Sequence, residues 1–125
     1  MQPVRIQRSR KHKQVSPNAL PIQYVGRPTK WGNPFKVVGE KGHWFVVNEN
    51  DEPLVTFNDK PDAIDFCVDN YKEYIKQEIK LGILNLDELK DKNLSCWCKI
   101  GERCHADVLL ELANGITKPQ NFNQC

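Results

Sequence analysis

The sequence predicts a small single-domain α/β sandwich, in which helices pack on a few-stranded mixed sheet and a β-hairpin forms an excursion. Three observations predict this class. The chain has 125 residues, enough for one ordinary core but short for two. Short β-prone stretches alternate with two amphipathic helical patterns. Hydrophobic content of 39% and charged content of 27% are those of a soluble globular protein.

The strands are predicted from β-prone residues bounded by turn residues. VRIQ alternates apolar and polar residues, IQYV ends at a glycine, and LSCWC is rich in residues that favour strands. Valine, phenylalanine and tryptophan between turn clusters predict the hairpin-like excursion. The predicted elements are strands at 4–7, 22–25 and 94–98, the excursion at 36–57, and a short helical turn at 84–91.

Two further patterns predict helices. Asp59 can cap the first, whose apolar positions recur at helical spacing from Ile64 onward. Cys67 falls on this apolar face, so we interpret it as core packing. The second helix spans 105–114, and Gly115 is placed to end it.

These elements predict one domain at residues 1–115, followed by a flexible tail at 116–125. Within the domain, residues 1–15 form a basic strand and arm, and residues 36–60 form a variable insert. Sites in open α/β sheets lie beyond the carboxyl ends of strands, so the two loops that follow predicted strands, 26–35 and 99–104, are where we expect a ligand.

Charge is distributed unevenly along the chain. Residues 1–39 hold eight lysines and arginines and no acidic residue, whereas residues 40–91 hold six against thirteen. Five of these cations fall within nine positions, which suggests attraction to phosphate or, alternatively, a solvated arm. They are Arg5, Arg8, Arg10, Lys11 and Lys13.

The distribution of apolar residues also predicts the cellular location of the protein. No apolar run approaches the roughly 20 residues of a membrane span, and no apolar stretch follows the basic N-terminus as in a signal peptide. We therefore expect no membrane partner and a cytoplasmic location, where the five cysteines stay reduced.

The stretch CWCKIGERCH gathers three cysteines and a histidine in ten positions. Zinc is one hypothesis, because Cys96, Cys98, Cys104 and His105 supply four ligands, although their spacing departs from C-x-x-C knuckles. A catalytic thiol at Cys98 or Cys104, with His105 or His43 as base, is the second. In the third hypothesis the thiols fill space under a pocket. No metal or other cofactor is our favoured expectation, with zinc as the alternative.

The loop GRPTKWGNPF carries residue types that suit a nucleotide. Arg27 and Lys30 bring positive charge, Trp31 offers a flat face for stacking, and Gly32 lets backbone approach a ligand. Asn33 can read a base edge or a ribose hydroxyl. The alternative is a rigid turn in which the tryptophan plugs the core.

The motifs RIQRSR, YVGRPTKWGNPF and LSCWC followed by CHADVLLELAN resemble, as a set, a small family of unknown function, the DUF4326-like domains of phage and bacterial genomes. The resemblance implies that the basic first strand and the two loops form one site. It also implies a phage-type protein acting in the host cytoplasm.

We therefore expect the protein to bind a nucleotide or nucleotide-derived molecule, as in sequestering a host immune signalling nucleotide. Alternatives are an enzyme that modifies or hydrolyses such a substrate, and a metal-binding or nucleic-acid-binding module; the oligomeric state stays open. The candidate catalytic residues are Cys98, Cys104, His105 and Asp107. The expected ligand-binding residues are Arg5, Arg8, Arg27, Lys30, Trp31, Gly32, Asn33, Cys96, Cys98, Cys104 and His105.

Overall fold

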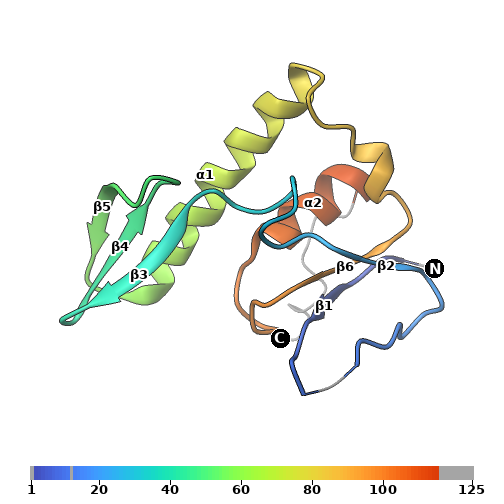
Figure 1. Ribbon diagram of the computed structural model, residues 1–125, viewed down its shortest axis with the longest axis horizontal. Coiled ribbons are helices and arrows are strands. Elements are labelled where there is room, and N and C mark those ends of the chain that lie inside the picture. The colour runs from blue at the N-terminus through green and yellow to red at the C-terminus, as the bar shows by residue number, and fades with distance from the viewer. Residues whose placement is uncertain (1, 12, 116–125) are drawn as a thin grey trace.

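The computed structural model describes residues 2–11 and 13–115, so the predicted tail at 116–125 lies outside the described residues. Within these residues six strands form two small sheets, accompanied by two α-helices and a 3-10 helix (Figure 1), which confirms the α/β class. In chain order the elements are β1 (Arg5–Gln7), β2 (Ile22–Tyr24), β3 (Lys36–Glu40), β4 (His43–Val47), β5 (Pro53–Phe57), α1 (Lys60–Lys80), η1 (Leu86–Leu89), β6 (Asn93–Cys96) and α2 (His105–Asn114).

The first sheet is parallel, in the order β1-β6-β2. All four residues of β6 are buried, as expected of a central strand between two neighbours. The strand ends at Cys96, earlier than predicted, so Trp97 and Cys98 do not continue the strand. The backbone N–H of Arg8 still donates to the carbonyl of Cys96, at 2.7 Å. The carboxyl ends of all three strands therefore meet at one edge.

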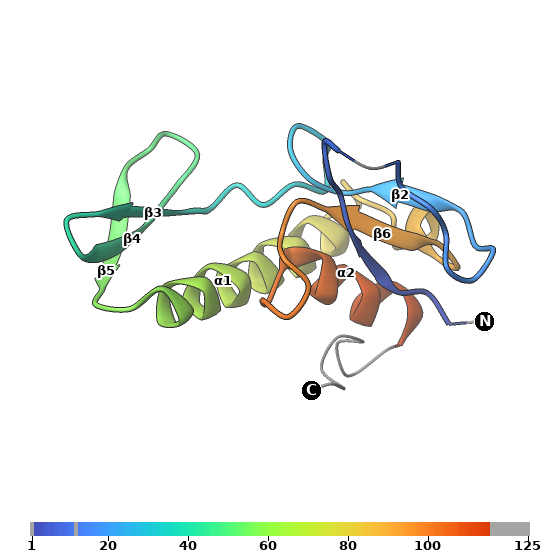
Figure 2. The ribbon, with the colours of Figure 1, turned by 90° about the horizontal axis from the view of Figure 1, so that it is seen from below.

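The second sheet is an antiparallel meander of β3, β4 and β5, built from the predicted excursion. It is separate from the parallel sheet, so the expected mixed sheet is instead two sheets of one type each. Figure 2 shows it beside the first turns of α1, away from the parallel sheet. Val46, Ala63 and Cys67 form a small core between this sheet and the helix. The first turns of the long helix thus pack on the small sheet, and its later turns pack against α2 in the main core.

Helix α1 has the N-terminal cap and the buried apolar face that its sequence pattern predicts. The Asp59 carboxylate caps it by accepting from the Asp62 N–H at 3.0 Å. Its buried face continues through Val68, Tyr71 and Ile75 into the main core. At 21 residues the helix is roughly 30 Å long, which lets it span both cores.

Helix α2 follows β6 after a loop and packs on the parallel sheet (Figure 2). Its apolar residues, among them Leu109 and Leu110, are fully buried in the main core. Gly115 ends it with a φ of 72°, a left-handed conformation that glycine adopts without cost. No helix in the described part of the chain combines the length and hydropathy needed to cross a membrane.

Candidate functional site

A cavity of about 320 Å³ opens at the carboxyl ends of β2 and β6. The segments that enclose it are residues 24–37, the first half of α1, and the loop from β6 to α2. This is the edge of a parallel sheet where ligands usually bind, and both loops singled out in the sequence contribute to it. Arg27, Asn33, Cys96, Cys98, Cys104 and His105 are the predicted ligand-binding residues that line it.

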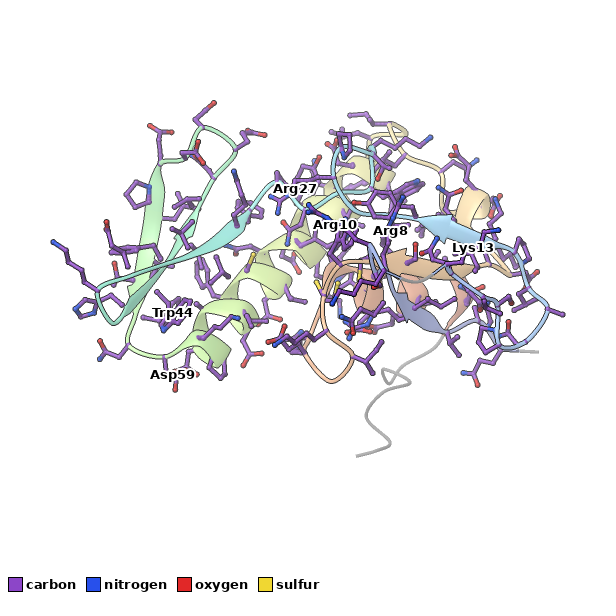
Figure 3. The ribbon with its side chains drawn as sticks, turned by 60° about the horizontal axis from the view of Figure 1, so that its bottom comes forward. Arg8, Arg10, Lys13, Arg27, Trp44 and Asp59 are labelled. Carbon is purple, nitrogen blue, oxygen red and sulfur yellow. The ribbon has the colours of Figure 1, made fainter. Side chains whose placement is uncertain are left out.

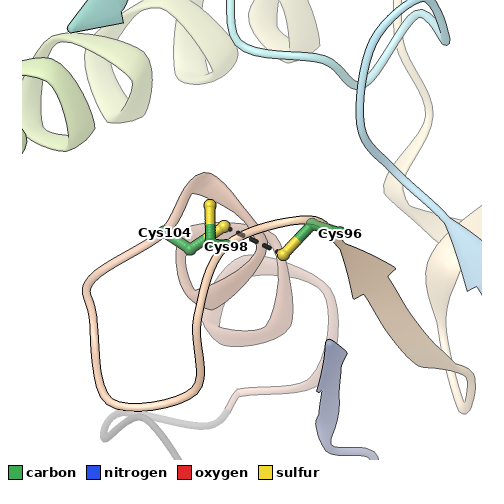
Figure 4. A group of neighbouring side chains, drawn as sticks. All are labelled: Cys96, Cys98 and Cys104. Atoms are coloured by element: carbon green, nitrogen blue, oxygen red, sulfur yellow. Dashed lines mark hydrogen bonds between the residues drawn. The ribbon is translucent and has the colours of Figure 1, made fainter. Parts of the chain in front are cut away.

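Three cysteines gather in its wall, and we refer to Cys96, Cys98 and Cys104 as the thiol cluster (Figure 4). Cys96 is the last residue of β6, whereas Cys104 is the N-cap of α2. Their sulfurs lie 3.1 Å apart. All three sulfurs lie within 4.8 Å of one another, so the thiol cluster could hold a metal ion.

The pKa values of the thiols differ from one another because the thiols are hydrogen-bonded to each other. Hydrogen bonds with the thiols of Cys104 and then Cys96 lower the pKa of Cys98 far below its ordinary value. Hydrogen bonds with Cys96 and with Cys98 raise the pKa of Cys104, and burial adds to this. The lowered pKa thus belongs to Cys98, the least buried of the three.

His105 is held in one orientation behind the thiol cluster. Its Nε2 lies 2.8 Å from the Val25 carbonyl oxygen, which can only accept, so Nε2 carries a proton. Its Nδ1 lies 3.5 Å from the Cys104 sulfur. Burial lowers the pKa of the imidazole, which keeps it neutral and leaves Nδ1 as an acceptor.

Arg5 and Asp107, predicted for phosphate binding and catalysis, do not line the cavity. They form an ion pair at 3.2 Å in which the side chains are only 2% and 8% exposed. Arg5 also donates to the Lys99 carbonyl at 2.8 Å, and the Asp107 carboxylate accepts from the Cys104 N–H at 3.1 Å. The pair therefore fixes the loop and the start of α2. Because the Cys104 N–H is bonded to Asp107, it is not free to hold an anion.

Most of the loop 26–35 serves the fold rather than the cavity. Trp31 is 3% exposed and lies in the main core, where its carbonyl accepts from the Tyr71 hydroxyl at 2.6 Å. Lys30 forms an ion pair with Glu88 outside the cavity. We expected Trp31 to stack on a ligand and Lys30 to contact it, but neither side chain lines this cavity.

Two neighbouring residues have equally local roles. A Cβ on Gly32 would lie 2.8 Å from the Arg27 Cγ, so the glycine makes room for that side chain rather than for a ligand. Asn33 is buried, and its side-chain oxygen accepts from the Phe35 N–H at 2.8 Å. Arg27 itself reaches the cavity and donates to the Asn33 carbonyl at 3.2 Å.

Two of the aromatic residues at the cavity, Tyr24 and Trp97, are absent from the expected ligand-binding residues. Trp97 is 47% exposed, and its indole N–H donates to the Tyr24 hydroxyl at 3.1 Å. The Arg8 guanidinium lies 4.5 Å from the centroid of the Tyr24 ring and 5.5 Å from that of Trp97. Figure 3 shows Arg8, Arg10 and Arg27 on the parallel-sheet side, away from Trp44 and Asp59. The signal for Trp97 was its place between two cysteines just after a strand.

Comparison with known proteins gives a family but no relative of described function. Neither the curated proteins nor the solved structures contain a significant match to this chain. A family model described as "Domain of unknown function (DUF4326)" matches residues 4–115. That span includes both loops, the thiol cluster and the whole of α2. The chain therefore belongs to the DUF4326 family, as its motifs predicted.

Proposed function

We propose that the cavity binds a small anionic molecule that carries an aromatic ring, of which a nucleotide is the type. The observation that carries the proposal is the composition of the cavity lining. Four lysines and arginines from separate segments line it, against a single carboxylate, that of Glu102. The four cations are Arg27, Lys36, Lys60 and Arg103.

Arg27 is the cation best placed for a phosphate group. Among the described residues no carboxylate lies within ion-pair distance of it, whereas Arg103 lies 3.1 Å from Asp65 and 3.0 Å from Asp69. An arginine without a protein counter-ion can offer both arms of its guanidinium to a phosphate. Arg8, beside the same edge, also has no carboxylate partner among these residues.

The ring of the ligand is assigned to Trp97 and Tyr24 in place of Trp31. An exposed indole ring beside a cavity supplies a stacking face, and stacking on a base contributes about 1–3 kcal/mol. The hydrogen bond between Trp97 and Tyr24 fixes the edge of that face. Phosphate and base contacts then lie at the same mouth, which favours a mononucleotide-sized ligand over a long strand.

The test is calorimetric titration of the purified chain with a panel of nucleotides and dinucleotides. Arg27→Ala should weaken binding about 10- to 100-fold, the loss of one or two charge-assisted hydrogen bonds. Trp97→Ala should weaken it comparably. Lys30→Ala is the matched control, because that lysine is paired with Glu88 outside the cavity. Equal losses for Arg27→Ala and Lys30→Ala, or no binding of any nucleotide at millimolar concentration, would count against the proposal.

A second candidate is chemical modification of the bound molecule, favoured by the lowered pKa of Cys98 in the cavity wall. Mass spectrometry of the ligand recovered after heat denaturation separates the two. Intact ligand supports binding alone, and with it the use we propose for a phage-type protein, the sequestering of a host signalling nucleotide. A changed mass supports an enzyme.

A further inference from the structure

We propose that the thiol cluster is a binding site for a soft divalent metal ion such as zinc, with one coordination position open to the cavity. The proposal stands on the three sulfurs and does not depend on the nucleotide proposed above. Three features of the structure carry it: the convergence of the sulfurs, the contrast with a cysteine used for packing, and their place in the cavity wall.

The convergence is built from three separate pieces of backbone. Cys96 ends a strand, Cys98 lies in the following loop, and Cys104 caps a helix, yet their sulfurs fall within 4.8 Å of one another. Tetrahedral zinc with Zn–S bonds of about 2.3 Å places its sulfurs about 3.8 Å apart. The Cys96 and Cys104 sulfurs lie 3.1 Å apart, and no pair of the three sulfurs is more than 4.8 Å apart. To admit the ion, Cys96 and Cys104 would have to separate by about 0.7 Å.

Cys67 shows what a cysteine used for packing looks like in the same chain. Its sulfur is buried against the small sheet, where its thiol donates to the Phe35 carbonyl at 3.4 Å. Its sulfur also accepts from the Asn33 side-chain amide at 3.5 Å, and although Cys67 lines the cavity it is not a member of the thiol cluster. Packing alone therefore does not require sulfurs to be gathered, because one buried thiol is satisfied by a carbonyl.

The ligand number leaves room for an exogenous donor. His105 is not part of the group within 4.8 Å, although its Nδ1 lies beside Cys104. Three protein ligands with an open fourth position distinguish catalytic and ligand-binding zinc from closed structural sites. All three cysteines line the cavity, so that position is reachable by water or by a donor atom of a bound molecule.

The surroundings also suit an anionic complex. Each thiol that binds zinc(II) gives its proton to solvent, so three thiolates and the ion together carry one negative charge. Cys104 is the N-cap of α2, where the positive end of the helix dipole lies next to that charge. The buried hydrogen bond of Cys104 N–H to Asp107 holds this ligand in place.

The experiment uses the full chain, reduced with a phosphine and stripped with a chelator. Titration with cobalt(II) should give thiolate charge-transfer absorption in the near ultraviolet and visible bands of a tetrahedral ion, at one ion per chain. Zinc should displace cobalt and appear as one ion per chain in the native mass spectrum. Cys98→Ser should weaken uptake roughly 100-fold or more. Cys67→Ser, the matched control, should leave it unchanged.

A second measurement needs no variant, in case Cys98→Ser prevents folding. Alkylation of the reduced chain, mapped by peptide mass, should be slowed by zinc at the thiol cluster and not at Cys67. Failure of the reduced wild-type chain to take up cobalt or zinc at micromolar concentration would overturn the proposal. So would equal loss of uptake in Cys67→Ser and Cys98→Ser.

Discussion

Replacing Arg5 with methionine tests whether the buried ion pair with Asp107 holds the fold together. The two side chains are 2% and 8% exposed and meet at 3.2 Å. Methionine keeps much of the apolar stem of arginine but removes the charge. It also removes the donor to the Lys99 carbonyl, and it leaves the Asp107 carboxylate without its buried counter-ion.

The expected cost follows from burial. Breaking a buried pair by removing one partner costs about 3–5 kcal/mol, because the remaining charge is desolvated without compensation. A domain of this size has a free energy of unfolding of about 5–15 kcal/mol, so a large share of its stability is at stake. The Arg5 Nε and Asp107 Oδ1 already lack hydrogen-bond partners among the described residues. No further bond to these two atoms therefore offsets the loss of the pair.

Urea denaturation followed by circular dichroism measures this cost, and Arg103→Met is the matched control. Arg103 meets Asp65 and Asp69 at nearly the same distances as Arg5 meets Asp107, but all three side chains are well exposed. Its replacement should cost at most about 1 kcal/mol. If Arg5→Met also cost less than about 1 kcal/mol, burial would not be what makes the pair matter, and the reasoning would be refuted.

Three further results are expected. Tyr71→Phe should cost about 1–3 kcal/mol in thermal or urea unfolding, because the buried Trp31 carbonyl loses its 2.6 Å donor; no measurable change would contradict that role. Leu109→Ala should cost about 2–5 kcal/mol, since the side chain is fully buried, whereas Leu54→Ala, at a position 49% exposed, should cost under about 0.5 kcal/mol in the same assay. Burial raises the pKa of Cys67 to about 11, so iodoacetamide should modify it only slowly at pH 8 and faster as pH approaches that value; rapid modification at Cys67, mapped by peptide mass in the folded chain at pH 8, would argue against its burial.

Local sequence patterns predicted the elements closely because each depends on near neighbours. Examples are the Asp59 cap, the apolar face of α1 and the end of α2 at Gly115. Each is determined by residues within a few turns of the same helix. The meeting of the two loops also followed from a local rule, since both come after strands of one parallel sheet. The family followed from motifs alone.

The direction in which each side chain points could not be predicted, because it depends on contacts between distant segments. The sequence suggested Arg5 as a phosphate ligand. In the structure Arg5 instead pairs with Asp107, more than a hundred positions away. Trp31 looked like a stacking face, but Tyr71 and the main core cover it. The predicted strand at 94–98 included Trp97; because β6 ends at Cys96, Trp97 lies in the following loop and lines the cavity.

The length of α1 has a consequence for how such a protein can diversify. One wall of the cavity, with Lys36, Val37 and Lys60, belongs to the small sheet and the helix start, while the opposite wall belongs to the main core. Substitutions in the first wall disturb a core of few residues, whereas those beside Cys96 or Cys104 disturb the central strand and α2. Under the function proposed above, changes within residues 36–60 would alter which molecule the cavity accepts and leave the thiol cluster as it is.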